Sequence, residues 1–196
     1  MGGAGAAGYH WGMRLLADTC VAVVVDVQER LLPHMTESRE VEAALVTLIG
    51  GLRTLGVPLL ATEQYPRGLG PTVQSVREAL DSGDGGSLPI EKIAFSCCDE
   101  PRFLERLDNL GRNQVVVAGI EAHVCVQQTL LDLRAAGREA WLVADAVSSR
   151  SPHDRDVALQ RAQQEGVWLG TVESVLFELC RAAGSDTFKA ISRLVK

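Results

Sequence analysis

Apolar runs and helical patterns alternate along the whole chain. Residues 20–26, CVAVVVD, form a continuous run of mainly β-branched residues, which is typical of a strand buried on both faces. A second run of this kind, QVVVAG, occupies residues 114–119. Segments with helical spacing separate such runs, and several end at a glycine, as 40–55 and 123–136 do. The pattern predicts strands and helices in regular alternation.

This alternation predicts the fold class. The strands are predicted at residues 20–26, 57–62, 91–95, 114–119, 139–144 and 167–169. The helices are predicted at residues 40–55, 72–80, 101–110, 123–136, 152–165, 172–182 and 188–194. Strand–helix alternation within one domain gives a parallel sheet with helices on both faces. We therefore expect an α/β fold, a three-layer α/β/α sandwich around a doubly wound, mostly parallel six-stranded sheet of Rossmann-like type.

The length of 196 residues fits one globular domain. Residues 1–12, MGGAGAAGYHWG, have no periodicity and no charged region before an apolar stretch. We interpret them as a flexible N-terminal extension rather than a signal peptide, with the folded domain at 13–196. No apolar run approaches the roughly 20 residues of a membrane span, so we expect no membrane partner.

Composition narrows the possible partners and cofactors. The 19 Lys and Arg against 25 Asp and Glu give a net charge of −6, which argues against a nucleic-acid partner. The five cysteines show no repeated C-x-x-C spacing, so we expect reduced thiols in the cytoplasm. The four histidines lack H-x-H and H-E-x-x-H spacing, and no G-x-G-x-x-G follows a strand. We therefore expect no metal and no cofactor.

We expect catalytic residues just beyond the carboxyl ends of the strands, where ligands bind in doubly wound sheets. Asp26 ends the first strand, where it could be a general base or only cap a turn. Lys92 lies between apolar neighbours, and it either pairs with an acid or extends its ammonium to solvent. Cys125 falls in the first turn of a predicted helix, which favours a thiolate, although many helix cysteines are inert. Together the three predict a nucleophile, a base and an orienting cation.

The segments that contain these residues resemble a known family. VVVDVQ with Asp26, EKIAFS with Lys92 and VVVAGIEAHVCV with Cys125 resemble, in this order, the isochorismatase-like cysteine hydrolases. The resemblance runs from about residue 20 to residue 196. TEQYPRGLGPTV at 62–73 and VADAVSSRS at 143–151 are similar to the subgroup of isochorismatase-domain-containing proteins.

The resemblance implies a site and its geometry. Asp26, Lys92 and Cys125 would form the catalytic triad of the family. A cis peptide bond would join Ile120 to Glu121. The oxyanion of the reaction would then rest on the backbone N–H groups of Glu121 or Ala122 and of Cys125.

The sequence also departs from relatives in the family. Nicotinamidases of the family hold a metal with an aspartate and two histidines after the second strand, whereas this chain has ATEQYPRG there. We therefore expect neither a metal nor nicotinamide as substrate. Many relatives have Thr-Asp where this chain has Ala122 and His123, which weakens a carboxylate-binding role at these positions.

We expect hydrolysis of a C–N bond in a small amide, ureide or carbamoyl compound through a thioester on Cys125. One alternative is isochorismatase-type hydrolysis of a vinyl ether with Asp26 as general acid, and another is a non-catalytic protein-interaction scaffold. Residues predicted to bind the substrate, with Phe95 equally open to a place in the core, are Gln28, Leu32, Gln64, Tyr65 and Phe95. The predicted partners are this small molecule and further copies of the chain, in a dimer or larger homo-oligomer.

Overall fold

The computed structural model describes residues 14–81 and 88–196 and contains one six-stranded sheet. Its strands are β1 (Cys20–Val25), β2 (Leu59–Gln64), β3 (Ile90–Lys92), β4 (Gln114–Ile120), β5 (Glu139–Ser148) and β6 (Trp168–Gly170). The spatial order is β3-β2-β1-β4-β5-β6, and every neighbouring pair is parallel. The predicted doubly wound α/β fold is confirmed, and strand order reverses between β1 and β4.

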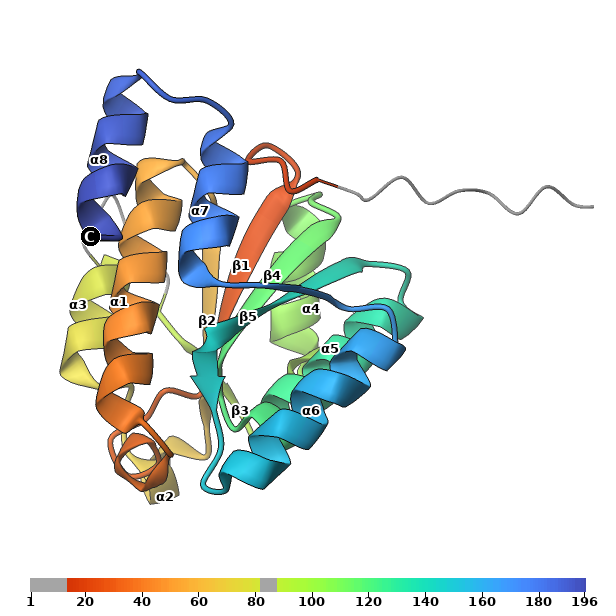
Figure 1. Cartoon of the computed structure of the whole chain (residues 1–196). Helices are drawn as coiled ribbons and strands as arrows, with labels where there is room; N and C mark the ends of the chain where they lie inside the picture. The colour runs from red at the N-terminus through yellow and green to blue at the C-terminus, as the bar shows by residue number, and fades with distance from the viewer. Residues whose placement is uncertain (1–13, 82–87) are drawn as a thin grey trace, which may run out of the picture.

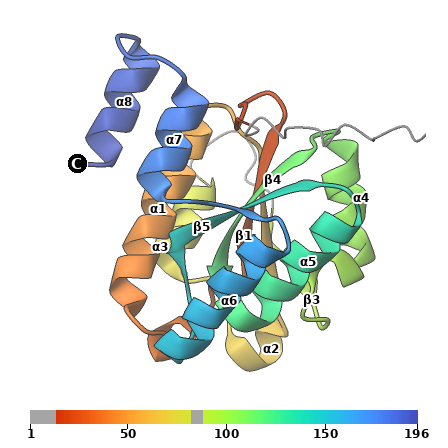
Figure 2. The same cartoon turned by 45° about the vertical axis from the view of Figure 1, so that its right-hand side comes forward.

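Helices cover both faces of this sheet. They are α1 (Ser38–Thr54), α2 (Pro66–Leu69), α3 (Gln74–Asp81), α4 (Pro101–Asn109), α5 (Gln127–Ala135), α6 (Pro152–Gln164), α7 (Val172–Cys180) and α8 (Asp186–Leu194). Helices α1, α3, α7 and α8 lie on one face, whereas α4, α5 and α6 lie on the other (Figures 1 and 2). Three short turns complete the elements: η1 (Leu32–His34), η2 (Cys97–Asp99) and η3 (Ala122–Val126).

The two central strands are buried at every position because helices pack against both of their faces. Along β1, Val24 belongs to the core on the side of α1 and α7, whereas Val23 belongs to the core on the side of α4 and α5. This arrangement explains the unbroken apolar runs of β1 and β4. It also places Asp26, the residue after β1, in the interior of the protein.

A close approach of β4 to β1 fixes the backbone beside Asp26. Gly119 pairs with Val25 and has a φ of +119°. A Cβ atom at residue 119 would lie 2.2 Å from the carbonyl oxygen of Val25. Only glycine meets both the conformation and the spacing, so the sequence AGI allows β4 to end next to the end of β1.

Several elements differ from the sequence expectation: β3 covers Ile90–Lys92 rather than 91–95, and α2 was not predicted. Strand β5 continues to Ser148 rather than ending near 144, because its pairing with β4 shifts between Val117 and Gly119 and then resumes. The predicted helix 123–136 is divided into the π-helical turn η3 and α5. Residues 1–12 lie outside the described residues. Within 14–81 and 88–196, no helix has the length and apolarity needed to cross a bilayer.

Candidate active site

Asp26 and Lys92 meet at the carboxyl ends of β1 and β3. The Lys92 Nζ atom lies 2.6 Å from the Asp26 Oδ2 atom, and both side chains are fully buried. Burial alone would lower the pKa of Lys92, but the charge of Asp26 and the nearby thiols raise it above its usual value. Lys92 is therefore protonated at neutral pH, and the contact is a buried ion pair.

The Lys92 ammonium has further acceptors besides Asp26. Gln64 Oε1 lies 2.8 Å from Nζ, and the carbonyl oxygens of Ala94 and Phe95 lie 3.2 and 3.0 Å away. These oxygens surround a group with three N–H donors. They replace the water that the ammonium loses on burial, so the ion pair has the hydrogen bonds that a buried charge requires.

Asp26 is held from its backbone and from its carboxylate. Its φ of 51° is left-handed, and its N–H donates to the carbonyl of Thr62 at 3.2 Å. The Thr62 hydroxyl donates to Oδ1 at 2.7 Å, while Lys92 occupies Oδ2. Both oxygens of the carboxylate therefore have a donor, and its orientation is fixed.

Cys125 lies in the turn η3 with 5% of its surface exposed. Burial is the main cause that raises the pKa of its thiol, and the charge of Asp26 and a hydrogen bond to Asp26 raise it further. Lys92 lowers the pKa by less than these causes raise it. The thiol is therefore protonated at neutral pH, and its pKa is sensitive to the Asp26 carboxylate.

This protonation state corrects the expectation that a helix N-terminus makes Cys125 a thiolate. The α-helix α5 begins only at Gln127, and η3 is a π-helical turn. Burial and the nearby carboxylate dominate the ionisation of the thiol. Any thiolate at Cys125 must form as the proton moves to a base.

The turn that contains Cys125 begins at the cis peptide bond between Ile120 and Glu121. The Glu121 carboxylate accepts hydrogen bonds from the backbone N–H and the Nε atom of Arg150, at 3.1 and 3.0 Å. His123 Nδ1 lies 2.9 Å from the hydroxyl of Ser149. These contacts attach the start of η3 to the segment that follows β5. Ala122, the other predicted oxyanion residue, is buried at the start of the same turn.

Two of the predicted substrate-binding residues lie in the interior. Gln28 is fully buried, and its Nε2 atom donates to the carbonyls of Gln64 and Gly70 at 3.0 and 2.6 Å. Its Oε1 atom accepts the N–H of Gln64 at 2.8 Å. Leu32 is 3% exposed and belongs to the core on the α1 side. In the structure Gln28 holds the segments after β1 and β2 together, and Leu32 packs in the core.

The other three predicted residues lie nearer the surface. Tyr65 and Phe95 are 51% and 53% exposed, so the structure places Phe95 at the surface and not in the core. The Gln64 amide uses its Oε1 atom for Lys92, and its Nε2 atom donates to the carbonyl of Ile93 at 2.6 Å. Gln64 therefore orients Lys92.

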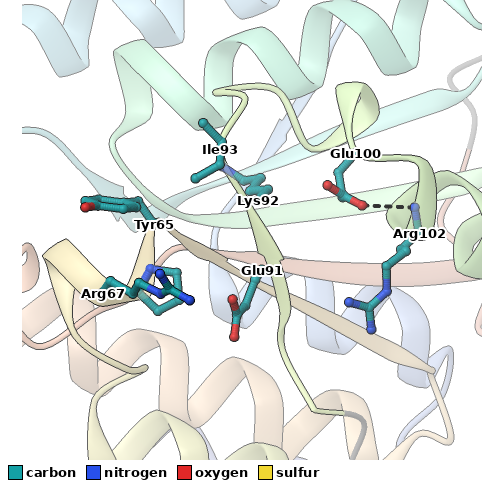
Figure 3. Close-up of a pocket in the computed structure, with 8 residues that line it drawn as sticks. Tyr65, Arg67, Glu91, Lys92, Ile93, Glu100 and Arg102 are labelled. Carbon is teal, nitrogen blue, oxygen red and sulfur yellow. Dashed lines mark hydrogen bonds between the residues drawn. The ribbon is translucent and has the colours of Figure 1, made fainter.

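A groove of about 440 Å³ follows the edge of β3. It lies between the segment that begins α2 and the start of α4 (Figure 3). Its lining combines exposed apolar side chains with charges of both signs: Tyr65, Pro66, Arg67, Glu91, Lys92, Ile93, Glu100 and Arg102. Within residues 14–81 and 88–196, no three His, Cys, Asp or Glu side chains are grouped as metal ligands would be.

Sequence reasoning missed three residues next to Asp26 and Cys125. Thr62 contacts Asp26, Thr129 contacts the carbonyl of Cys125, and Cys97 lies between the two threonines. Thr62 ends the predicted strand 57–62, as Asp26 ends 20–26, and this shared position is a signal that could have identified it. Thr129 and Cys97 have no such signal, because the contacts of Cys97 with the two threonines join separate segments of the chain.

Comparisons with known proteins identify the family of this chain. A family model described as the isochorismatase domain matches residues 20–174. Isochorismatase domain-containing protein 2A of Mus musculus is 38% identical over 186 residues, which cover 93% of this chain and 85% of that protein.

Solved structures show the same fold. The MAR1 ribonuclease of Caenorhabditis elegans superposes with a TM-score of 0.86 at 35% identity, covering 93% of this chain and 92% of that one. YcaC of Pseudomonas aeruginosa, solved with hexane-2,5-diol and covalent acrylamide, has a TM-score of 0.83 at 25% identity, with 91% and 89% covered. The chain therefore belongs to the isochorismatase family and has the fold of isochorismatase-like hydrolases.

Proposed function

We propose that this chain hydrolyses the C–N bond of a small amide, ureide or carbamoyl compound with Cys125 as nucleophile. The observation that carries the proposal is the buried Asp26–Lys92 ion pair next to a protonated Cys125. A thiol, a base within hydrogen-bond reach and a cation that holds the base are the parts that covalent catalysis requires.

The first half of the reaction forms a thioester. The Cys125 sulfur attacks the carbonyl carbon as its proton moves to Asp26, because the raised pKa of the thiol leaves little free thiolate beforehand. The electron pair of the C=O bond moves to oxygen, and Lys92 keeps Asp26 in place. We assign the oxyanion to the N–H groups of Glu121 or Ala122 and of Cys125. One such donor contributes about 3–4 kcal/mol to an oxyanion hole.

The second half regenerates the thiol. The tetrahedral adduct collapses, the C–N bond breaks, and Asp26 gives its proton to the departing nitrogen. Water then attacks the thioester with Asp26 as base, and the C–S bond breaks. The proton held by Asp26 returns to the sulfur of Cys125, so the net reaction consumes one water. General-base assistance of this kind contributes about 10²–10⁴-fold to the rate.

The similar proteins support a cysteine nucleophile that acts on a small substrate more than they support cleavage of RNA. A covalent acrylamide, as in the Pseudomonas aeruginosa YcaC structure, needs a nucleophile, and Cys125 is the candidate in this chain. The relative from Caenorhabditis elegans is called a ribonuclease. The net charge of −6 here lacks the basic footprint of an RNA-binding protein, so we favour a small substrate.

The proposal also includes the cellular location of the chain and its assembly into a homo-oligomer. All five cysteines are free thiols, which supports the reducing cytoplasm as the location. Formation of a homo-oligomer and independence from metals and cofactors stay predictions.

The test is a turnover screen of small amides, ureides and carbamoyl compounds, with RNA and a vinyl ether included. We expect Cys125→Ala to lower turnover of the substrate by at least about 10⁴-fold. Cys180→Ala, a thiol on α7 away from the site, should leave turnover unchanged. Vinyl-ether turnover that survives Cys125→Ala would replace the proposal with the acid-catalysed alternative. Cleavage of RNA alone, or of nothing in the screen, would overturn it.

A further inference from the structure

Thr62 makes two contacts behind the triad. The side chain is buried at 1% exposure, and its hydroxyl donates to Asp26 Oδ1 at 2.7 Å. The same oxygen lies 3.7 Å from the Cys97 sulfur. A hydroxyl has one proton to donate, and here it donates it in the hydrogen bond to the Asp26 carboxylate. The Cys97 thiol is therefore the donor in the second contact. Burial and Asp26 raise the pKa of Cys97 to about 11, so this thiol keeps its proton at neutral pH.

Thr129 makes a matching pair of contacts on the nucleophile side. It lies on α5, four residues after Cys125, and is fully buried. Its hydroxyl donates to the carbonyl of Cys125 at 2.7 Å. The same oxygen accepts the backbone N–H of Cys97 at 2.9 Å. One hydroxyl thus connects the nucleophile turn to η2.

Cys97 is the common neighbour of the two threonines. Its sulfur contacts Thr62 and its N–H contacts Thr129, and the residue is fully buried. The contacts form a continuous path that begins at Asp26, passes through these three residues and ends at Cys125. The path runs behind Asp26, Lys92 and Cys125, in addition to the direct influence of the Asp26 carboxylate on the pKa of the Cys125 thiol.

We propose that Thr62 and Thr129, connected through Cys97, are positioning residues that hold Asp26 and Cys125 at the distance that proton transfer requires. Proton transfer to a base depends on hydrogen-bond reach, and small displacements of a catalytic group slow the reaction strongly. The inference rests on the proposed function, because it assigns these residues to the base and nucleophile of that reaction.

The two threonines act on different steps. Thr62 donates to the charged form of Asp26, and a hydrogen bond to a carboxylate favours its ionised form. The Thr129 hydroxyl donates to the carbonyl of Cys125 and accepts the N–H of Cys97, and it has no hydrogen bond to Asp26, so it sets position without contacting the base. Loss of Thr62 should therefore change the pH dependence of Cys125, whereas loss of Thr129 should change its rate at every pH.

The experiment measures alkylation of Cys125 by iodoacetamide as a function of pH, with each labelled cysteine identified by mass spectrometry. It needs no substrate, so it works even if none is known. Thr62→Val should shift the acid limb of the Cys125 profile upward by about one pH unit, the effect of losing a hydrogen bond to a charged group. Thr62→Ser keeps the hydroxyl and should restore the parent profile.

Thr129→Val provides the second arm and decides the matter if Thr62→Val does not fold. It should lower the alkylation rate by about tenfold across the pH range with the limb unmoved, and Thr129→Ser should restore the rate. The matched control is Thr54→Val, since Thr54 makes the same contact to the carbonyl four residues earlier at an exposed position of α1. That control should leave Cys125 labelling unchanged.

The outcomes separate this inference from the proposed function. Folded Thr62→Val and Thr129→Val variants with the parent profile would overturn the positioning role and leave the nucleophile assignment intact. If Cys125 of the parent protein is labelled no faster than Cys97, the proposed nucleophile is wrong, and the positioning role fails with it.

Discussion

Lys92 and Lys189 each pair with an aspartate, in two regions that differ in their exposure to water. At the ends of the central strands, Lys92 and Asp26 are 2.6 Å apart and fully buried. On α8, Lys189 and Asp186 are 2.9 Å apart, but their side chains are 59% and 99% exposed. Water can replace the second contact and not the first. The surroundings of an ion pair, more than its length, therefore decide what it contributes.

The glycines of the two regions differ in the same way. Gly119 and Gly184 both have positive φ, +119° and +95°. A Cβ atom at Gly119 would collide with the backbone of Val25, at 2.2 Å from its oxygen, whereas one at Gly184 would meet nothing within 4 Å. The central region is closely packed around the candidate site, and the α7–α8 corner has free space.

The largest expected change in stability comes from substituting Gly119, and Gly184 is its comparison. Gly119→Ala should lower the free energy of unfolding by more than about 4 kcal/mol, because the strand pair must separate and the φ is unfavourable for alanine. Gly184→Ala should cost about 1 kcal/mol, from its φ alone. Chemical denaturation measures both values. Equal losses would show that the close approach of β1 and β4 does not constrain this site.

The second largest contrast in stability is expected between substitutions of Lys92 and Lys189. Lys92→Met removes the partner of a buried carboxylate, and we expect a loss of about 3–5 kcal/mol in the free energy of unfolding. Lys189→Met should change it by less than about 0.5 kcal/mol, since the exposed pair is screened by water. Urea titration of both variants at neutral pH checks the contrast. A Lys92→Met variant as stable as the parent would mean that the buried pair is not needed for the fold.

A smaller effect for each residue is expected from Cys20, Cys97 and Cys98 at alkaline pH. Burial raises the pKa of Cys20 and of Cys98 to about 12, and the pKa of Cys97 is about 11, against an ordinary value of 9.0. Above pH 9 the unfolded chain loses thiol protons that the folded chain keeps, so stability falls as pH rises. Each thiol adds about 1.4 kcal/mol per pH unit to this slope.

The pH slope can be tested with one thiol. Cys20→Ala should make the fall of the free energy of unfolding between pH 9 and 11 less steep by about 1.4 kcal/mol per pH unit, the contribution of one thiol. Lys92 contributes in the same direction, because its raised pKa keeps the folded form protonated at higher pH than the unfolded form. A stability that stays constant or rises over this interval would contradict the burial of these groups.

Much of the fold and part of the site could be predicted from the sequence. The apolar runs of β1 and β4 gave the centre of the sheet because a strand covered on both faces has no polar positions. Asp26 and Cys125 follow those two runs, so their convergence could be expected from the rule that parallel strands end at one edge. The close approach of Lys92 to Asp26 was expected from the family resemblance and matches the ion pair.

The uses of Gln28 and Gln64 could not be predicted from the sequence. Gln28 bonds to residues 36 and 42 positions away, and a polar residue near a strand end looks the same whether it faces a ligand or the backbone. The ionisation of Cys125 was also beyond the sequence, since it depends on burial and on the position of Asp26. Both depend on three-dimensional distances that periodicity does not supply.

The central claim is that Asp26 takes the proton of Cys125. The most direct measurement is the rate of Cys125 alkylation by iodoacetamide at neutral pH in the parent protein and in Asp26→Asn. We expect Cys125 to react faster than Cys20, Cys97, Cys98 and Cys180 in the parent protein. We expect Asp26→Asn to slow it by at least about 100-fold, the lower range for a general base, because loss of the base outweighs the lower pKa that the thiol has without the Asp26 charge. An equal rate in the two proteins would contradict the account.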